Sequence, residues 1–158
     1  MRSFIALFVL LAFSQLSSAQ VKCYKGNFQM SSDLCYRIEN NQLYRSTATF
    51  REVEYLFLAG NVVYLGRKGD LQSPLYTLQS EKIYKGSSTM SSDLLYTIYE
   101  NGIYVGNSTI SSDCLYSIQN GKIYRGKSES TFDLLLSCDK ETLSGDELLL
   151  LMAAVLPY

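Results

Sequence analysis

The segment KIYKGSSTMSSDLLYTIYEN, residues 82–101, is one copy of a twenty-residue unit that the chain repeats without insertion. Six copies follow one another, at 22–41, 42–61, 62–81, 82–101, 102–121 and 122–141. Each residue within a copy has a place from one to twenty. Because the spacing is constant, we expect every copy to form the same structural unit and to pack against its neighbours in the same way.

Each copy is predicted to supply two β-strands. In the fourth copy, Ile83–Lys85 and Leu94–Ile98 are rich in branched and aromatic residues, and the small polar residues 86–93 between them are typical of a loop. Asn101-Gly102 and Asn120-Gly121 follow second strands. Asn-Gly between two apolar runs predicts a two-residue hairpin turn. Six copies therefore predict twelve antiparallel strands.

Tyrosine occupies the third place of all six copies, at Tyr24, Tyr44, Tyr64, Tyr84, Tyr104 and Tyr124. Tyrosine suits a strand and packs on its cross-strand partner, and this structural role is the favoured interpretation. The same six rings are also a candidate ligand surface for a glycan. The apolar residues at places two, fifteen and seventeen share one strand face, which we predict to line the interior, with the third place outside.

Residues 1–19 have the features of an export signal. Arg2 precedes the apolar run Phe4–Phe13, and Ser17-Ser18-Ala19 supplies small residues for cleavage before Gln20. A membrane anchor is the alternative, but about ten apolar residues are too few to span a bilayer. We therefore expect a secreted or periplasmic protein whose mature chain, residues 20–158, is a single repeat-built domain.

The charged residues argue against several functions. The chain has 14 basic and 15 acidic residues, and removal of Arg2 leaves 13 basic ones, so no nucleic-acid partner is expected. The chain has no histidine, the commonest general base, so we predict no enzymatic activity, metal or cofactor. Four aspartates share place twelve, and we predict that they form local turns rather than bind calcium. They are Asp33, Asp93, Asp113 and Asp133.

The tail of the chain predicts a helix over residues 144–156. Ser144 and Glu147 form a capping-box pattern, and nine apolar residues, 148–156, follow before Pro157. Nine consecutive apolar positions cover every face of a helix, so this helix must be surrounded. It is too short to cross a bilayer, and we predict that the protein is not transmembrane. Twelve strands closed into a barrel would enclose it and would leave no sheet edge exposed.

The cysteines bear on whether the ring closes. In the hairpin at Asn120-Gly121, place seventeen faces place two across the turn, and Cys138 and Cys23 hold those places in the last and first copies. A closed ring would set these two residues about 4.5 Å apart at Cα, within disulfide range. We predict a Cys23–Cys138 disulfide. The alternative is a Cys23–Cys35 pair within one copy, and the pairing of Cys35 and Cys114 stays open.

Hairpins repeated to twelve strands and followed by an apolar C-terminal helix resemble the tubby C-terminal-like barrel superfamily, which includes tubby proteins and phospholipid scramblases. The resemblance implies an all-β fold in which a closed twelve-stranded barrel is threaded by its C-terminal helix. It also implies a lipid as partner, and it supplies no binding residue. The short copies are similar to those of exported bacterial repeat proteins. The alternative architecture is an open β-solenoid with one coil per copy.

These features together predict an exported, non-enzymatic binding or structural protein of the cell envelope or extracellular space. A lipid-associated protein and a carbohydrate-binding repeat module are the two alternatives, so the expected ligand is a glycan or a lipid.

Overall fold

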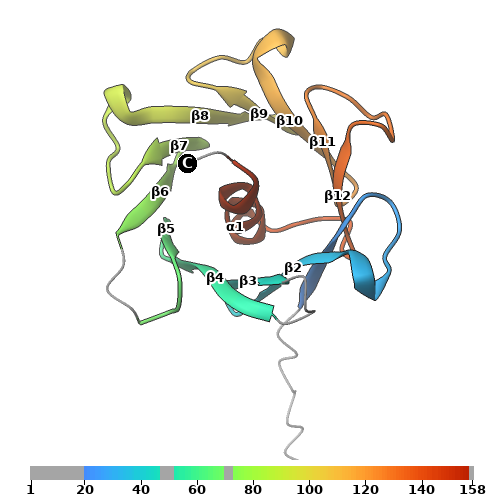
Figure 1. Ribbon diagram of the computed structural model, residues 1–158. Helices are drawn as coiled ribbons and strands as arrows, with labels where there is room; N and C mark the ends of the chain where they lie inside the picture. The colour runs from blue at the N-terminus through green and yellow to red at the C-terminus, as the bar shows by residue number, and fades with distance from the viewer. Residues whose placement is uncertain (1–19, 47–51, 70–72, 157–158) are drawn as a thin grey trace, which may run out of the picture.

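The predicted strands form a ring that closes on itself, with a helix inside it (Figure 1). The computed structural model describes residues 20–46, 52–69 and 73–156, and within these residues the chain has twelve strands and one α-helix. The strands are β1 (Val21–Lys25), β2 (Leu34–Glu39), β3 (Gln42–Ser46), β4 (Glu52–Ala59), β5 (Val62–Leu65), β6 (Pro74–Gln79), β7 (Lys82–Lys85), β8 (Leu94–Tyr99), β9 (Gly102–Val105), β10 (Cys114–Gln119), β11 (Lys122–Arg125) and β12 (Leu134–Cys138). The helix is α1 (Gly145–Val155).

Each strand pairs antiparallel with the strands that precede and follow it in the chain. The ring closes because the first strand, β1, also pairs antiparallel with the last, β12. The closed twelve-stranded barrel around a helix is therefore confirmed. The open β-solenoid is wrong, because hairpin turns return each second strand beside the next first strand instead of stacking coils.

The two ends of the barrel differ. The hairpin turns between copies lie at one end, here called the turn end. The longer loops within copies lie at the other, the loop end, and they spread outward around the ring in Figure 1. Three of these loops contain a single 3₁₀ turn, at Ser31–Asp33, Ser91–Asp93 and Ser111–Asp113.

The loop aspartates form local hydrogen bonds. The Ser88 hydroxyl donates to the Asp93 carboxylate at 2.5 Å, and the Ser128 hydroxyl donates to Asp133 at 2.6 Å. The predicted turn-forming role is thus confirmed for these two aspartates.

A β-bulge recurs at the same point of each copy. Between β7 and β8, Ile83 pairs with Tyr96 and Tyr84 pairs with Leu94, so Leu95 at place fourteen is the extra residue. The Leu95 carbonyl accepts a hydrogen bond of 2.7 Å from the amide of Gly106, at place five of the next copy. Gly106 has φ 59°, which explains why glycine recurs at that place.

The same bond closes the ring. The amide of Gly26, in the first copy, donates to the Leu135 carbonyl of the last copy at 3.3 Å. The seam between β12 and β1 therefore repeats the geometry of the junctions between successive copies.

The turn at Asn120-Gly121 lies where the sequence predicts it, with φ 49° and 70° at the two residues. The turn predicted at Asn101-Gly102 is wrong by one residue. Tyr99 pairs with Gly102, so the central residues are Glu100 and Asn101. Gly102 instead makes room for a side chain, because a Cβ on it would lie 2.7 Å from the ring of Tyr104.

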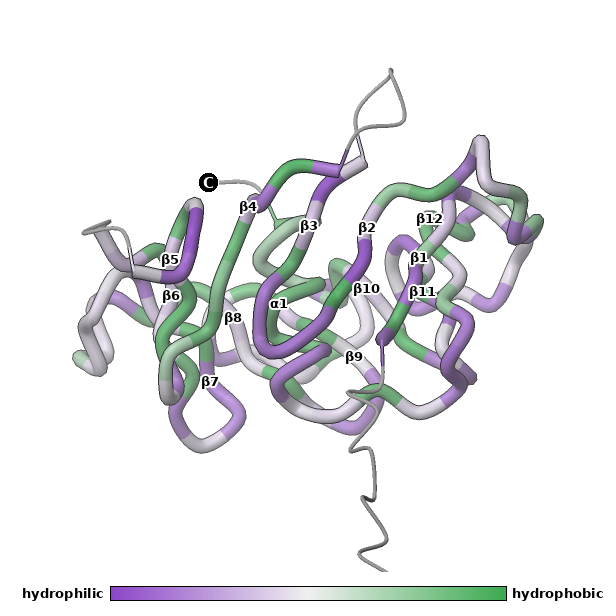
Figure 2. The backbone as a smooth tube through the Cα atoms, turned by 90° about the horizontal axis from the view of Figure 1, so that it is seen from below, coloured by the Kyte–Doolittle hydropathy of each residue, from purple (hydrophilic) through white to green (hydrophobic). Residues whose placement is uncertain are grey.

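Places two, fifteen and seventeen face the interior and pack on α1, as predicted. Figure 1 shows α1 inside the ring, and Figure 2, turned by 90°, shows α1 at the same level as the strands. The Ser144 hydroxyl accepts from the Glu147 amide while the Glu147 carboxylate accepts from the Ser144 amide, so the capping box is confirmed. The helix is off-centre, because it packs mainly against β2 to β6.

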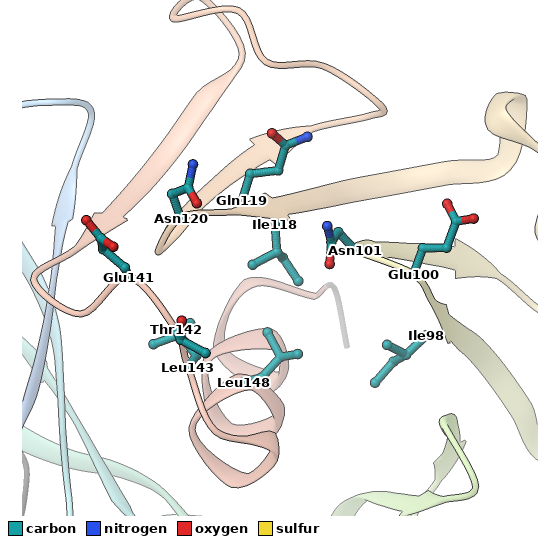
Figure 3. A pocket seen from close by; sticks show the side chains of 10 residues that line it. All are labelled: Ile98, Glu100, Asn101, Ile118, Gln119, Asn120, Glu141, Thr142, Leu143 and Leu148. Carbon is teal, nitrogen blue, oxygen red and sulfur yellow. The ribbon is translucent and has the colours of Figure 1, made fainter.

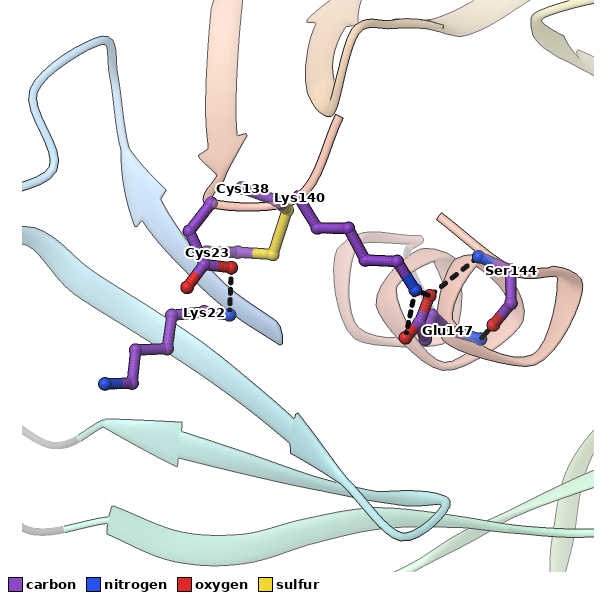
Figure 4. A network of polar contacts seen from close by, with 7 residues as sticks. Lys22, Cys23, Cys138, Lys140, Ser144 and Glu147 are labelled. Carbon is purple, nitrogen blue, oxygen red and sulfur yellow. Dashed lines mark hydrogen bonds and ion pairs between the residues drawn. A yellow bond between two sulfur atoms is a disulfide. The ribbon is translucent and has the colours of Figure 1, made fainter. Parts of the chain in front are cut away.

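The first and last strands are joined covalently, as Figure 4 shows. The predicted Cys23–Cys138 disulfide is confirmed, and its Cα atoms are 4.0 Å apart. The pairing Cys23–Cys35 is wrong, and both Cys35 and Cys114 are free thiols. Beside the disulfide, the Lys22 amide donates to the Asp139 carboxylate at 2.8 Å.

The same segment anchors the helix (Figure 4). Lys140 Nζ donates to both carboxylate oxygens of Glu147, at 2.9 and 2.8 Å. Burial raises the pKa of Glu147, but hydrogen bonds from Lys140 and Ser144 outweigh it and leave that pKa below its usual value.

Candidate functional site

The helix α1 runs from the turn end of the barrel to the loop end. Ser144 and Glu147 line a hollow together with the hairpin residues Asn40 and Asn41. At its other end, the Val155 carbonyl accepts a long hydrogen bond, 3.5 Å, from the hydroxyl of Tyr116. Because α1 leans toward β2 to β6, space remains beside it along the opposite wall of the barrel.

Basic side chains form the inner edge of the loop end. Residues at place four lie directly opposite residues at place fifteen, and opposed residues share a strand face. The pairs Tyr36–Arg45, Tyr76–Lys85 and Tyr116–Arg125 show this, and Lys25 faces Leu136 at the seam. Since place fifteen faces the interior, place four does too. Lys25, Arg45, Lys85 and Arg125 are all exposed, and together they are called the basic rim.

A row of tyrosines lies just inside the basic rim. This tyrosine arc consists of Tyr36, Tyr55, Tyr76, Tyr96 and Tyr116, all packed against the core. Burial, together with a smaller contribution from the hydroxyls of Tyr96 and Tyr55, raises the pKa of Tyr76 to about 12. Burial also raises the pKa values of Tyr36 and Tyr96. The phenols of Tyr36, Tyr76 and Tyr96 are therefore neutral at ordinary pH.

A cavity of about 470 Å³ opens between the basic rim and the tyrosine arc. Its walls are mostly apolar: Pro74, Leu75, Leu95 and the rings of Tyr76 and Tyr96, with Lys85 and Gly86 at the edge. Leu75 and Leu95 both hold place fourteen, so the recurring bulge turns them toward this space. Basic rim, tyrosine arc and cavity are together called the loop-end mouth.

A second opening of about 490 Å³, the turn-end cleft, lies between α1 and the β8 and β10 wall. Figure 3 shows Ile98 and Ile118 pointing from the wall toward the helix, which carries Leu148, while the side chains of Glu100, Gln119 and Asn120 extend away from it. The aliphatic residues are Ile98, Ile118, Leu143 and Leu148. The polar residues are Glu100, Asn101, Gln119, Asn120, Glu141 and Thr142.

The repeat and the closed ring have a counterpart among known families. A family profile described as "6-fold beta flower protein" matches residues 23–149, which is most of the chain. The chain belongs to the 6-fold beta flower family. A closed ring built from six copies of two strands each agrees with that description.

Two other comparisons add little to the beta flower assignment. The chain is similar to the crystal structure of an Arabidopsis thaliana protein, at 12% identity and a TM-score of 0.42, over 85% of this chain and 89% of that one. A search of curated proteins found no match. The resemblance to the tubby superfamily stays a prediction.

The six tyrosines at place three lie on the outside of the beta flower, as predicted. Tyr104 and Tyr124 are 2% and 8% exposed, and the other four are half-buried. Arg37 lies 4.0 Å over the ring of Tyr44, and Phe57 stacks on Tyr64 at 4.9 Å. These contacts fit the favoured packing role of the tyrosines. That the six tyrosines form a ligand surface stays a prediction.

The described part of the beta flower contains neither a metal site nor a membrane-spanning helix. Residues 20–46, 52–69 and 73–156 contain no cluster of three histidine, cysteine or acidic side chains suited to a metal ion. None of the helices in the described ranges is long and apolar enough to cross a membrane. The predicted signal sequence, 1–19, lies outside the described residues.

The loop-end mouth was not predicted, although its signal is in the sequence. Lys or Arg recurs at place four in four of the six copies, two residues after the apolar residue at place two. In a strand, residues two apart share a face. A basic residue following a core residue in this way therefore marks the inner edge of a barrel.

Proposed function

We propose that this beta flower is an exported, non-enzymatic binding protein whose ligand occupies the loop-end mouth. The observation that supports the proposal is that Lys85 of the basic rim and Tyr76 and Tyr96 of the tyrosine arc meet at one apolar cavity. Ligand sites are commonly concave and apolar, with a few convergent polar groups, and have volumes of roughly 300–1,000 Å³.

Binding fits the chemistry of the mouth better than catalysis. A general base works best with a pKa near the operating pH. Burial raises the pKa values of the Tyr36, Tyr76 and Tyr96 phenols above their usual range, away from the operating pH. These phenols and the basic rim are suited to holding a ligand by hydrogen bonds and charge.

Export to the periplasm or the extracellular space agrees with two features. Disulfides persist in oxidising compartments, and the Cys23–Cys138 bond joins the ends of the repeat array. Residues 1–19 carry the predicted export signal.

Carbohydrate binding at the turn-end cleft is a second candidate function. Its rim of amide and carboxylate side chains offers donors and acceptors for hydroxyl groups, and its aliphatic floor offers a surface for the C–H face of a sugar ring. This arrangement favours a glycan at the cleft over the outer tyrosines, whose ring faces are partly covered.

The test is a thermal-unfolding screen of the mature protein with probes of different chemistry. The panel contains sodium phosphate, decanoate, decyltrimethylammonium and chitotriose, because a ligand that binds the native state raises the melting temperature. The screen is repeated with Lys85→Gln/Arg125→Gln in the mouth and Asn101→Ala/Gln119→Ala in the cleft. The proposal expects one probe whose effect is lost only in the mouth variant. A panel in which no effect depends on the mouth contradicts it.

A further inference from the structure

We propose that the loop-end mouth binds a single-chain anionic amphiphile, with its acyl chain in the cavity and its carboxylate at the basic rim. This inference rests on the proposed function and names the ligand class.

Charge favours an anion at this opening. Lys25, Arg45, Lys85 and Arg125 face inward around one ring, and none of them makes an ion pair with any residue in the described ranges. The Arg45 guanidinium lies over the ring of Tyr55, 5.5 Å from its centroid. Lys85 lines the edge of the cavity, where its positive potential attracts an anion, and the other three basic residues add to the potential around the ring.

The cavity favours an acyl chain over a small inorganic anion. Pro74, Leu75 and Leu95 present only carbon atoms to it, apart from backbone groups, and the rings of Tyr76 and Tyr96 complete the wall. A bare phosphate would leave this surface in contact with water. A flexible apolar chain would remove it from water, with a gain proportional to the area buried.

Lys85 places the binding site for the carboxylate next to the cavity for the acyl chain. It lies directly opposite Tyr76 in the β6–β7 hairpin and lines the cavity at its edge. A carboxylate at the edge would therefore meet the Lys85 ammonium while its chain points inward. The Tyr96 phenol, which also lines the cavity, supplies a further donor, and hydrogen bonds to a charged partner are the stronger ones.

Isothermal titration calorimetry of the full mature protein tests the inference, with hexanoate, octanoate and decanoate as probes below their micelle concentrations. If the chain enters the cavity, each added methylene should tighten binding about fourfold. Lys85→Gln should weaken decanoate binding about tenfold. Lys82→Gln is the matched control, because Lys82 lies at the turn end of the same strand, and it should leave the Kd unchanged.

Three results would overturn the inference. Acetate or phosphate binding as tightly as decanoate would indicate a site for free anions. Decyltrimethylammonium binding equally well and insensitively to Lys85→Gln would remove the role of the basic rim. Sedimentation with anionic phosphatidylglycerol vesicles, without uptake of monomeric decanoate, would indicate a membrane surface as the partner.

The proposed function and this inference fail in different ways. If chitotriose or another probe binds in a manner that depends on the mouth and decanoate does not, the binding function stands and the ligand class is wrong. If no probe depends on the mouth, both are wrong.

Discussion

The sulfur atoms of Cys23 and Cys138 are bonded across the seam between β1 and β12, although the two residues are 115 positions apart in the chain. Every other junction in the ring joins strands that are neighbours in sequence. The bond thus fastens the junction that has no short connection of its own.

Removal of this bond should destabilise the barrel strongly. For Cys23→Ala/Cys138→Ala we expect a loss of roughly 2–5 kcal/mol in the free energy of unfolding, because the unfolded chain gains the freedom of an opened loop. Denaturant unfolding under oxidising conditions measures it. Cys35→Ala/Cys114→Ala keeps the bond and is the control. Equal losses in the two double variants would contradict the role given to the seam.

Gly121→Ala should cost more stability than Gly60→Ala. Both glycines occupy hairpin turns with positive φ, 70° and 63°, so both substitutions carry the left-handed strain of about 1 kcal/mol. Only at Gly121 would the new Cβ lie 2.2 Å from the Lys140 carbonyl oxygen, whereas at Gly60 nothing lies within 4 Å. Urea unfolding of the two variants measures the difference, and similar midpoints would show that Lys140 moves away freely.

Ser137→Ala should be neutral or stabilising, while Ser117→Ala should cost about 1 kcal/mol. Both residues hold place sixteen and are buried. The Ser117 hydroxyl donates to the Ser128 carbonyl at 2.9 Å, whereas the Ser137 hydroxyl has no hydrogen-bond partner within the described ranges. Thermal unfolding of the two variants checks the contrast. A comparable loss in both would mean that the Ser137 hydroxyl is satisfied in solution.

Glu147 should make stability depend on pH in the acid range. Its pKa is lower in the folded protein than in the unfolded chain, so the unfolded chain binds the proton more readily. The stabilisation is therefore present above the unfolded-state pKa and is lost as the pH falls through the folded-state pKa.

Glu147→Gln should remove this acid dependence and cost about 1 kcal/mol at neutral pH, through the weakened capping box and the lost ion pair with Lys140. Asp146→Asn, at the exposed neighbouring position, is the control. Unfolding free energies between pH 3 and 7 give the result. An unchanged slope in Glu147→Gln would contradict the assignment.

Constant spacing made the ring predictable, because six equal copies impose six equal junctions. The pairing of Cys23 with Cys138 followed from applying the Ile118–Ile123 pairing to the seam. The bulge at Leu95 was not predictable, since an extra residue in a strand leaves no mark in an apolar run. The bulge turns Leu95 toward the cavity. The turn prediction at Asn101-Gly102 failed for another reason: this pair holds places twenty and one, whereas the turn occupies places nineteen and twenty in both copies.

The site was harder to predict than the fold. An apolar helix had to be enclosed, but nothing in the uniform run 148–156 indicates which wall it prefers. The helix α1 packs mainly against β2 to β6, and the cavity extends from β6 over β7 and β8, which pack little on the helix. Lys85 was visible in the sequence, but its role depends on this tertiary asymmetry.

The most direct test of the central claim is a ¹H–¹⁵N NMR titration of the mature protein with decanoate. The account predicts shifts at the amides of Leu75, Lys85, Leu95 and Tyr96, at the loop-end mouth, with the turn-end amides of Ile118 and Asn120 unmoved. Shifts confined to the turn-end cleft, or no shifts at all, would contradict it.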